Sequence, residues 1–136
     1  MITTIQLVTI LYKALNTNAP ITNTITGEVY KDWRPAASTL EDIVVNAVVM
    51  DGSESVIQRA VANVNLHLPS IITQGGAMPD NGRFETLSQI ITPVLEDGTA
   101  ENYNWWIENT ATIKEQNKDQ WYLNFRIRFK YHNTNN

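Results

Sequence analysis

Residues 103–113, YNWWIENTATI, and residues 121–131, WYLNFRIRFKY, decide the fold that this sequence predicts. Both segments alternate side chains with a period of two, which is typical of strands that bury one face. Asn117 lies midway between them, and asparagine tolerates the left-handed backbone angles of a tight turn. The two segments are therefore predicted to form a long antiparallel hairpin, with paired residues equidistant from Asn117.

The register of this hairpin follows from its centre. One face is predicted to lie in the core and to hold the pairs Ile113 with Trp121, Ala111 with Leu123, Asn109 with Phe125, Ile107 with Ile127, Trp105 with Phe129 and Tyr103 with Tyr131. On the other face Glu108 is placed opposite Arg126, and Trp106 opposite Arg128. An ion pair and a cation–π pair at cross-strand distance support this register.

Three further strands are predicted upstream. Residues 29–33 alternate and are ended by Pro35, and residues 43–50 are apolar on both faces, which suits a central strand covered on both sides. After a turn at residues 51–53, residues 58–68 have one apolar and one polar face. The apolar face holds Ala60, Ala62, Val64, Leu66 and Leu68, and the polar face holds Arg59, Asn63, Asn65 and His67.

Two helices are predicted from caps and apolar spacing. Thr3 and Gln6 fit a capping box at the start of the first helix. Its apolar stripe is Ile5, Val8, Leu11, Tyr12 and Leu15. Asp80 or Asn81 caps the second helix, and Pro93 is expected to kink or shorten it because proline lacks the backbone amide. Its apolar residues are Phe84, Leu87, Ile90, Ile91, Val94 and Leu95.

The connections differ in composition. Residues 16–27 are rich in Thr and Asn and are predicted to be a loop. Residues 69–79 contain apolar side chains that a solvated loop does not favour, so this connection is expected to contact another surface. Those side chains are Ile71, Ile72 and Met78. The polar tail, residues 132–136, is predicted to be frayed.

The element order is helix, three strands, helix and two strands. It predicts a single α+β domain over residues 1–136, with an antiparallel sheet of about five strands and two helices packed on one face. A two-layer domain leaves the second sheet face uncovered. Because Val44, Val48 and Trp106 point at or near that face, another chain is expected to cover part of it.

Composition excludes some classes of function. Ten Lys and Arg residues against fourteen Asp and Glu give a net charge of -4, which disfavours a protein that binds nucleic acid by neutralising phosphates. The absence of cysteine removes disulfides, thiolate metal sites and cysteine nucleophiles. No Lys or Arg precedes the apolar residues of segment 1–11, so it does not fit a signal peptide and synthesis in the cytoplasm is expected.

No catalytic residue, metal site or cofactor is predicted. His67 follows Asn63 and Asn65 on a strand, and no Gly-x-Ser-x-Gly motif presents a serine, so a surface or interface histidine is favoured over a catalytic one. The paired carboxylates lack the spacing of a calcium loop and fit helix caps and solvated edges. Gly75 and Gly76 are not followed by a phosphate-loop motif.

Aromatic and cationic side chains suggest two binding hypotheses. Arg126, Arg128 and Lys130 form a cationic row with Trp106 and Tyr122 nearby, a pattern that could bind single-stranded nucleic acid. The negative net charge favours a solvated or interface-facing strand instead. Trp33 and Trp106 are also candidates for stacking against sugars, so a small non-enzymatic module that binds carbohydrate or protein is an alternative function.

The element order, together with residues 27–30 (GEVY), 34–35 (RP), 41–45 (EDIVV) and 64–69 (VNLHLP), resembles tail-completion and tail-terminator proteins of tailed bacteriophages. The resemblance covers most of the chain. It implies a structural, non-enzymatic virion protein of the tail or neck, made in the bacterial host. Subunits of that family form a ring, typically six-fold, that joins the tail tube to the head connector while DNA passes through.

The resemblance also implies the partners. They are other copies of the chain, the adjacent tail-tube and head-connector proteins, and DNA that crosses the lumen without specific binding, with no membrane. The surfaces expected to make these contacts carry Ile71, Ile72, Met78, Trp106, Arg126, Arg128 and Lys130. A different connector or a tail-tube-like subunit is a second alternative. The role of residues 16–27 is left open by the resemblance.

Overall fold

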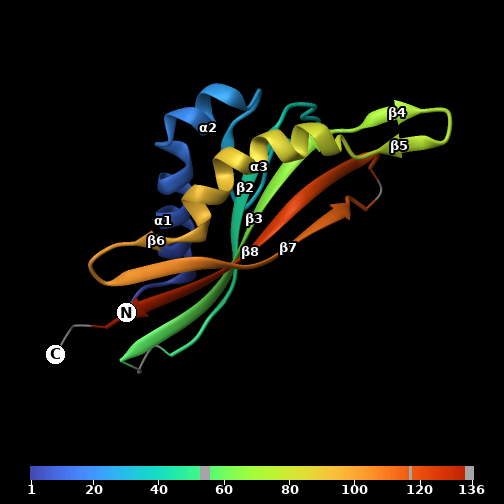
Figure 1. Cartoon of the computed structure of the whole chain (residues 1–136). Helices are drawn as coiled ribbons and strands as arrows, with labels where there is room; N and C mark the ends of the chain where they lie inside the picture. The colour runs from blue at the N-terminus through green and yellow to red at the C-terminus, as the bar shows by residue number, and fades with distance from the viewer. Residues whose placement is uncertain (53–55, 117, 134–136) are drawn as a thin grey trace.

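A curled six-stranded sheet lies under three helices in the computed structural model, which describes residues 1–52, 56–116 and 118–133 (Figure 1). The sheet order is β1-β2-β3-β8-β7-β6, and β4 and β5 form a separate hairpin. The helices are α1 (Thr4–Asn16), α2 (Ala19–Thr24) and α3 (Asn81–Glu96). The strands are β1 (Val29–Lys31), β2 (Asp42–Met50), β3 (Ile57–Pro69), β4 (Ile71–Thr73), β5 (Gly76–Met78), β6 (Gly98–Thr99), β7 (Tyr103–Lys114) and β8 (Gln120–His132).

The α+β class is confirmed, but the sheet is larger and less uniform than predicted. β1 pairs in parallel with β2, while the other neighbours in the sheet are antiparallel. Residues 32–41 carry the chain back to the start of β2, which allows the parallel pairing. The two-residue strand β6, the hairpin of β4 and β5, and the helix α2 were all missing from the prediction.

The register of the β7–β8 hairpin is confirmed in its first half and wrong in its second. Trp105 pairs with Phe129, and Ile107 with Ile127, as predicted. A β-bulge between Ile107 and Asn109 then shifts the pairing by one residue, so Asn109 pairs with Arg126 rather than with Phe125. The shift exchanges the two faces of the strand and keeps Asn109 out of the core. The predicted turn centre, Asn117, lies outside the described residues.

The bulge also corrects two more predicted pairs. Ala111 pairs with Asn124 and Ile113 with Tyr122, in place of Leu123 and Trp121. Ile113 is therefore exposed, on the sheet face opposite the helices.

The first helix has the predicted capping box. The Thr3 side chain accepts a hydrogen bond from the Gln6 amide, and the Gln6 side chain accepts one from the Thr3 amide. The predicted stripe is wrong at Ile5, which is 77% exposed. The face that α1 buries holds Leu7, Val8, Leu11 and Leu15.

The loop predicted for residues 16–27 is wrong, because α2 lies within it. Asn18 caps this helix by accepting a hydrogen bond from the Ile21 amide at 3.1 Å, and Pro20 occupies the first turn, where a missing amide has no cost. Ile21 is fully buried.

The third helix begins at the predicted cap and runs through Pro93 to Glu96, so Pro93 does not shorten it. Arg83 holds α3 against the start of β2. Its guanidinium donates to both carboxylate oxygens of Glu41 at 2.6 and 2.8 Å, and to the carbonyl oxygen of Thr24 at 3.0 Å. This clamp ties α3 to β2 and to the end of α2.

The helices cover one face of the sheet and enclose an apolar core cluster. The predicted inner face of β3, from Ala60 to Leu68, is buried throughout. The prediction that residues 43–50 are covered on both sides is wrong at the end of the strand, because Val48 and Val49 are 52% and 53% exposed. β1 has already ended there, and a bulge between Ala47 and Val49 disturbs the pairing with β3.

The beginning of the tail is also ordered by backbone pairing. The His132 amide donates to Asn102, and the Asn133 amide donates to Val56, both at 2.7 Å. The predicted fraying is wrong for these two residues, and residues 134–136 lie outside the described part of the chain. Among the described residues, the helices are all too short or too polar to span a bilayer.

Candidate functional site

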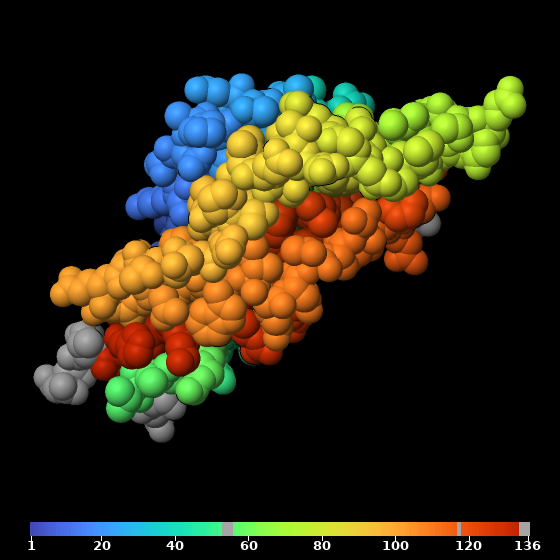
Figure 2. Space-filling view, in the orientation of Figure 1, coloured from blue at the N-terminus to red at the C-terminus, as the bar shows by residue number. Residues whose placement is uncertain are grey.

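The predicted connection at residues 69–79 is a projecting β-hairpin. β4 and β5 extend from the end of β3 beyond the body of the molecule (Figures 1 and 2). Its predicted contact residues are exposed, Ile71 to 43%, Ile72 to 72% and Met78 to 44%. Such a concentration of apolar surface on a projection is typical of an interaction site.

Local contacts hold the hairpin in place. The Trp121 indole donates to the carbonyl oxygen of Ala77 at 3.3 Å, and the Thr73 hydroxyl donates to that of Gly76 at 2.8 Å. Gly76 has a φ of 120°, a conformation that side chains disfavour. These hydrogen bonds stabilise the hairpin that carries the exposed side chains of Ile71, Ile72 and Met78.

The predicted cationic row lies on the sheet face opposite the helices. Arg126 and Arg128 both bind Glu108, each through its Nε atom, at 2.8 and 2.9 Å. These hydrogen bonds, that of Arg128 first, lower the pKa of Glu108. The predicted pairing of Trp106 with Arg128 is confirmed in register, but the guanidinium of Arg128 is directed to the carboxylate. The Glu108 carboxylate therefore forms ion pairs with two arginines, Arg126 and Arg128.

Arg59 and Lys130 extend the cationic surface toward the end of the sheet. They pair in register on adjacent strands, β3 and β8. Together with Trp106, Glu108 and Arg128 they line a hollow of about 320 Å³. Arg59 was not among the predicted site residues, although its place on the polar face of β3 was. Four cationic side chains gather here, those of Arg59, Arg126, Arg128 and Lys130, and they outnumber the carboxylates beside them, Glu108 and Asp51. This region is therefore positive on a protein whose net charge is -4.

An asparagine ladder crosses the same face. The Asn63 amide donates to Asn46 at 3.2 Å, and the Asn124 amide donates to Asn63 at 3.1 Å and to Asn65 at 2.7 Å. Three adjacent strands contribute to it. The ladder satisfies these side chains internally, so the centre of the face is polar without being charged.

A buried polar cluster closes one end of the sheet and was missed by sequence reasoning. Arg34 Nη1 donates to Asp42 at 2.8 Å, and both side chains are almost fully buried. Arg34 also donates to Gln120, and the Ser38 hydroxyl donates to Asp42 at 2.5 Å. The sequence signal for this cluster is weak, an acidic residue, Asp42, at the start of the β-branched strand β2.

His67 lies beside this cluster and is 8% exposed, so the predicted surface or interface position is wrong. Burial, and next the charge of Arg34, lower the pKa of His67 to about 4. Its Nδ1 faces Glu115 Oε2 at 3.8 Å, and neither atom has a hydrogen-bond partner among the residues that the structure describes. The ring lies 5.0 Å from that of Tyr122. At neutral pH the buried imidazole of His67 is therefore uncharged, and it packs against the ring of Tyr122.

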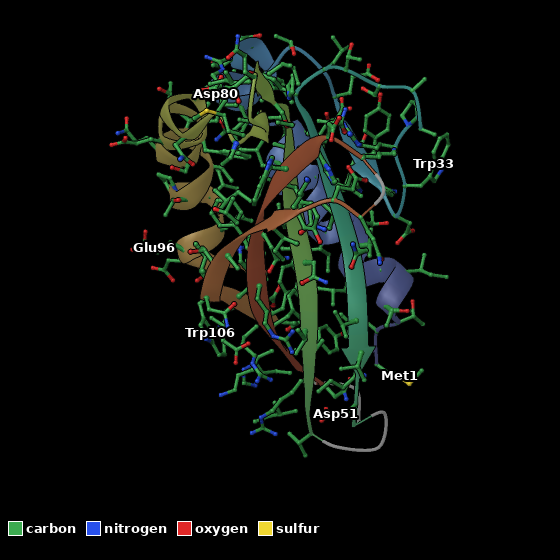
Figure 3. All side chains as sticks on the ribbon, turned by 90° about the vertical axis from the view of Figure 1, so that its right-hand side faces the viewer. Met1, Trp33, Asp51, Asp80, Glu96 and Trp106 are labelled. Carbon is green, nitrogen blue, oxygen red and sulfur yellow. The ribbon has the colours of Figure 1, made fainter. Side chains whose placement is uncertain are left out.

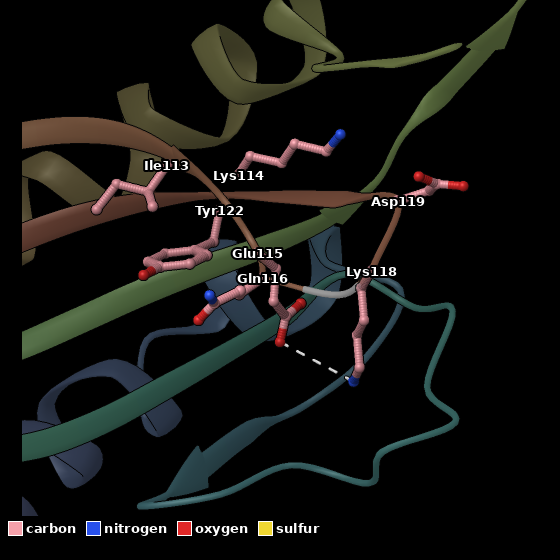
Figure 4. Close-up of a pocket in the computed structure, with 7 residues that line it drawn as sticks. All are labelled: Ile113, Lys114, Glu115, Gln116, Lys118, Asp119 and Tyr122. Carbon is pink, nitrogen blue, oxygen red and sulfur yellow. Dashed lines mark ion pairs between the residues drawn. The ribbon is translucent and has the colours of Figure 1, made fainter.

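The hollow nearest to this cluster lies at the end of the β7–β8 hairpin. Tyr122, Ile113, Lys118 and Glu115 are among the residues that line about 670 Å³ of open space (Figure 4). Lys118 and Glu115 approach each other at 3.9 Å across it. Within the described residues, no group of three or more His, Cys, Asp or Glu side chains is arranged to hold a metal ion.

The two tryptophans proposed for sugar stacking are not brought together. Trp33 follows β1, is 68% exposed and lies at one side of the sheet, while Trp106 lies on β7 at the other side (Figure 3). A shared stacking platform is therefore not formed by this pair.

Comparison with known proteins does not assign the chain to a family. No model of a protein family matches the chain, and no curated protein matches it.

The candidate site consists of two surfaces, the β4–β5 hairpin and the cationic face of β3, β8 and β7. The predicted contact residues fall into these two groups.

Proposed function

We propose that this protein is a structural virion subunit of a tailed bacteriophage, a tail terminator or neck protein that assembles into a ring. The ring joins the tail to the head connector, and DNA passes through it. The observation that carries the proposal is the projecting hairpin with its exposed apolar residues Ile71, Ile72 and Met78. An assembly protein has a use for such a projection, since a neighbouring subunit buries it.

The cationic face supports a second contact. Besides the neighbouring copies, each subunit of such a ring meets the tail tube or the head connector, so it needs more than one kind of contact surface. The β4–β5 hairpin is separate from the six-stranded sheet, whose open face carries Arg59, Arg128 and Lys130. Their different chemistry, apolar and basic, fits contacts with different partners, such as another copy and the tail-tube or connector protein.

The charge balance suits passage of DNA. A net charge of -4 limits the release of counterions on which tight binding to phosphates depends. In this proposal the basic face contacts a protein partner, so DNA passes the subunit without being held.

The test is the oligomeric state of the purified chain. Multi-angle light scattering and electron microscopy of the wild type are expected to show closed rings. The Ile72→Asp variant is expected to lower the ring population at least tenfold, because it places a charge in the apolar contact. Ile5→Asp is the matched control, since Ile5 is equally exposed but lies on α1.

A wild type that stays monomeric at all concentrations, and that does not join phage particles, contradicts the proposal. Equal ring populations in the Ile72→Asp and Ile5→Asp variants contradict the role given to the hairpin.

A further inference from the structure

The six-stranded sheet has two open strand edges, one at each side. At one side β6 pairs only with Asn104 and Trp105, so in the described part of the chain residues 107–114 of β7 have strand partners on β8 alone. At the other side β1 pairs with residues 43–45, and residues 46–50 of β2 have described strand partners on β3 alone. Open edges present backbone N–H and C=O groups that pair readily with another strand.

The side chains along both edges favour pairing. Residues 108–114 of β7 are all exposed and include the β-branched Thr110, Thr112 and Ile113. On β2 the exposed residues are Val48 and Val49. Neither edge contains proline, and residues 46–50 carry no charge. The charged residues on the open edge of β7, Glu108 and Lys114, lie at its two ends, and Glu108 is already bound by Arg126 and Arg128. Proteins that keep an edge unpaired place proline or charged side chains along it.

We propose that the open edge of β7 pairs with the open edge of β2 of a second copy, so that the sheet continues from one subunit to the next. This inference rests on the proposed ring. It specifies a head-to-tail contact between two different surfaces, the type of contact that closes rings. Val48 and Val49 are covered by the neighbour in this arrangement.

The strand directions agree with such a continuation. β2, β3, β8 and β7 are successively antiparallel, so β7 runs opposite to β2. A second copy in the same orientation therefore presents β2 antiparallel to β7, and the alternation continues. The open part of β2 is shorter than that of β7, so its whole length finds a partner.

The two edges of one copy cannot meet each other. Two strands, β3 and β8, separate β2 from β7, which corresponds to about 14 Å at the usual spacing of strands. A disulfide joins Cα atoms that lie within about 7 Å. A disulfide between these edges must therefore link two copies.

The experiment uses the absence of cysteine from the chain. Three double variants combine Val49→Cys with Thr110→Cys, Ala111→Cys or Thr112→Cys, to sample neighbouring registers. After mild oxidation, at least one double variant is expected to give a ladder of covalent multimers on a non-reducing gel. The single variants are expected to remain at the mass of one chain. Thr86→Cys with Thr112→Cys is the matched control, since Thr86 is exposed on α3.

The outcomes separate this inference from the proposed function. Multimers in light scattering without any crosslink in the three double variants overturn the edge pairing and leave the ring intact. A disulfide dimer of the Thr112→Cys single variant indicates two-fold pairing of β7 with β7 and also overturns it. A monomeric protein without crosslinks overturns both. Far-ultraviolet circular dichroism of each variant verifies that the fold is kept.

Discussion

The buried histidine makes the stability of this protein depend on pH. His67 has a pKa of about 4 in the folded protein, against about 6.5 in an unfolded chain. As the pH falls, the unfolded state takes up the proton first, so the stabilising contribution is complete above pH 6.5 and is lost toward pH 4. Linkage between these two pKa values gives a loss of about 2 kcal/mol between pH 7 and pH 5.

The assay is urea unfolding followed by tryptophan fluorescence at pH 7 and pH 5, at one protein concentration. The wild type is compared with His67→Gln, which removes the titrating group. His132→Gln is the matched control, because His132 is the only other histidine and is exposed. Between pH 7 and pH 5, the free energy of unfolding of the wild type and of His132→Gln is expected to decrease by about 2 kcal/mol more than that of His67→Gln.

The surroundings of His67 explain the direction of the effect. The charges of Arg34 and Lys118 disfavour a proton on the ring, and that of Asp42 favours it, while burial is the largest cause. An equal fall in stability for the wild type and His67→Gln refutes this reasoning. A titration of the His67 ring by NMR with a midpoint near 6.5 refutes it as well.

Three further predictions concern stability, measured by urea unfolding. Asp80→Ala removes the cap of α3 and should cost about 1 kcal/mol, and an unchanged midpoint contradicts that role. Gly98→Ala puts a methyl group into the buried indole ring of Trp105 and should cost about 1 to 3 kcal/mol, whereas Gly75→Ala makes only an ordinary contact with the Thr73 hydroxyl and should cost much less. Arg83→Met leaves the buried Glu41 carboxylate unpaired and should cost about 3 kcal/mol, and a loss below 1 kcal/mol shows that the clamp contributes little.

The strands and helices that were predicted best from the sequence are those whose patterns involve residues close together in the chain. The capping box at Thr3 and the alternation of β3 depend only on near neighbours, and both are confirmed. The β7–β8 register was predictable as far as Ile107, since a symmetric hairpin contains no signal for a bulge. The bulge depends on whether Asn109 enters the core, which the rest of the sheet decides.

The candidate site was predictable in part. Ile71, Ile72 and Met78 were identified because apolar residues in a connection are unusual, and they are exposed. The clusters around Arg34 and Arg83 were not identifiable, because each joins residues that are distant in sequence. The burial of His67 depends on those same distant residues.

The central position of β3 has a kinetic consequence. β3 pairs along its whole length with β8, so residues such as Val64 and Phe125 must meet across the intervening α3 and the β7 strand. Pairing of segments that are distant in sequence slows folding, whereas β7 and β8 are adjacent in the chain and can pair without closing a long loop. In the nascent chain, the sheet around β2 and β3 is therefore expected to stay incomplete until the last strand, β8, has been synthesised.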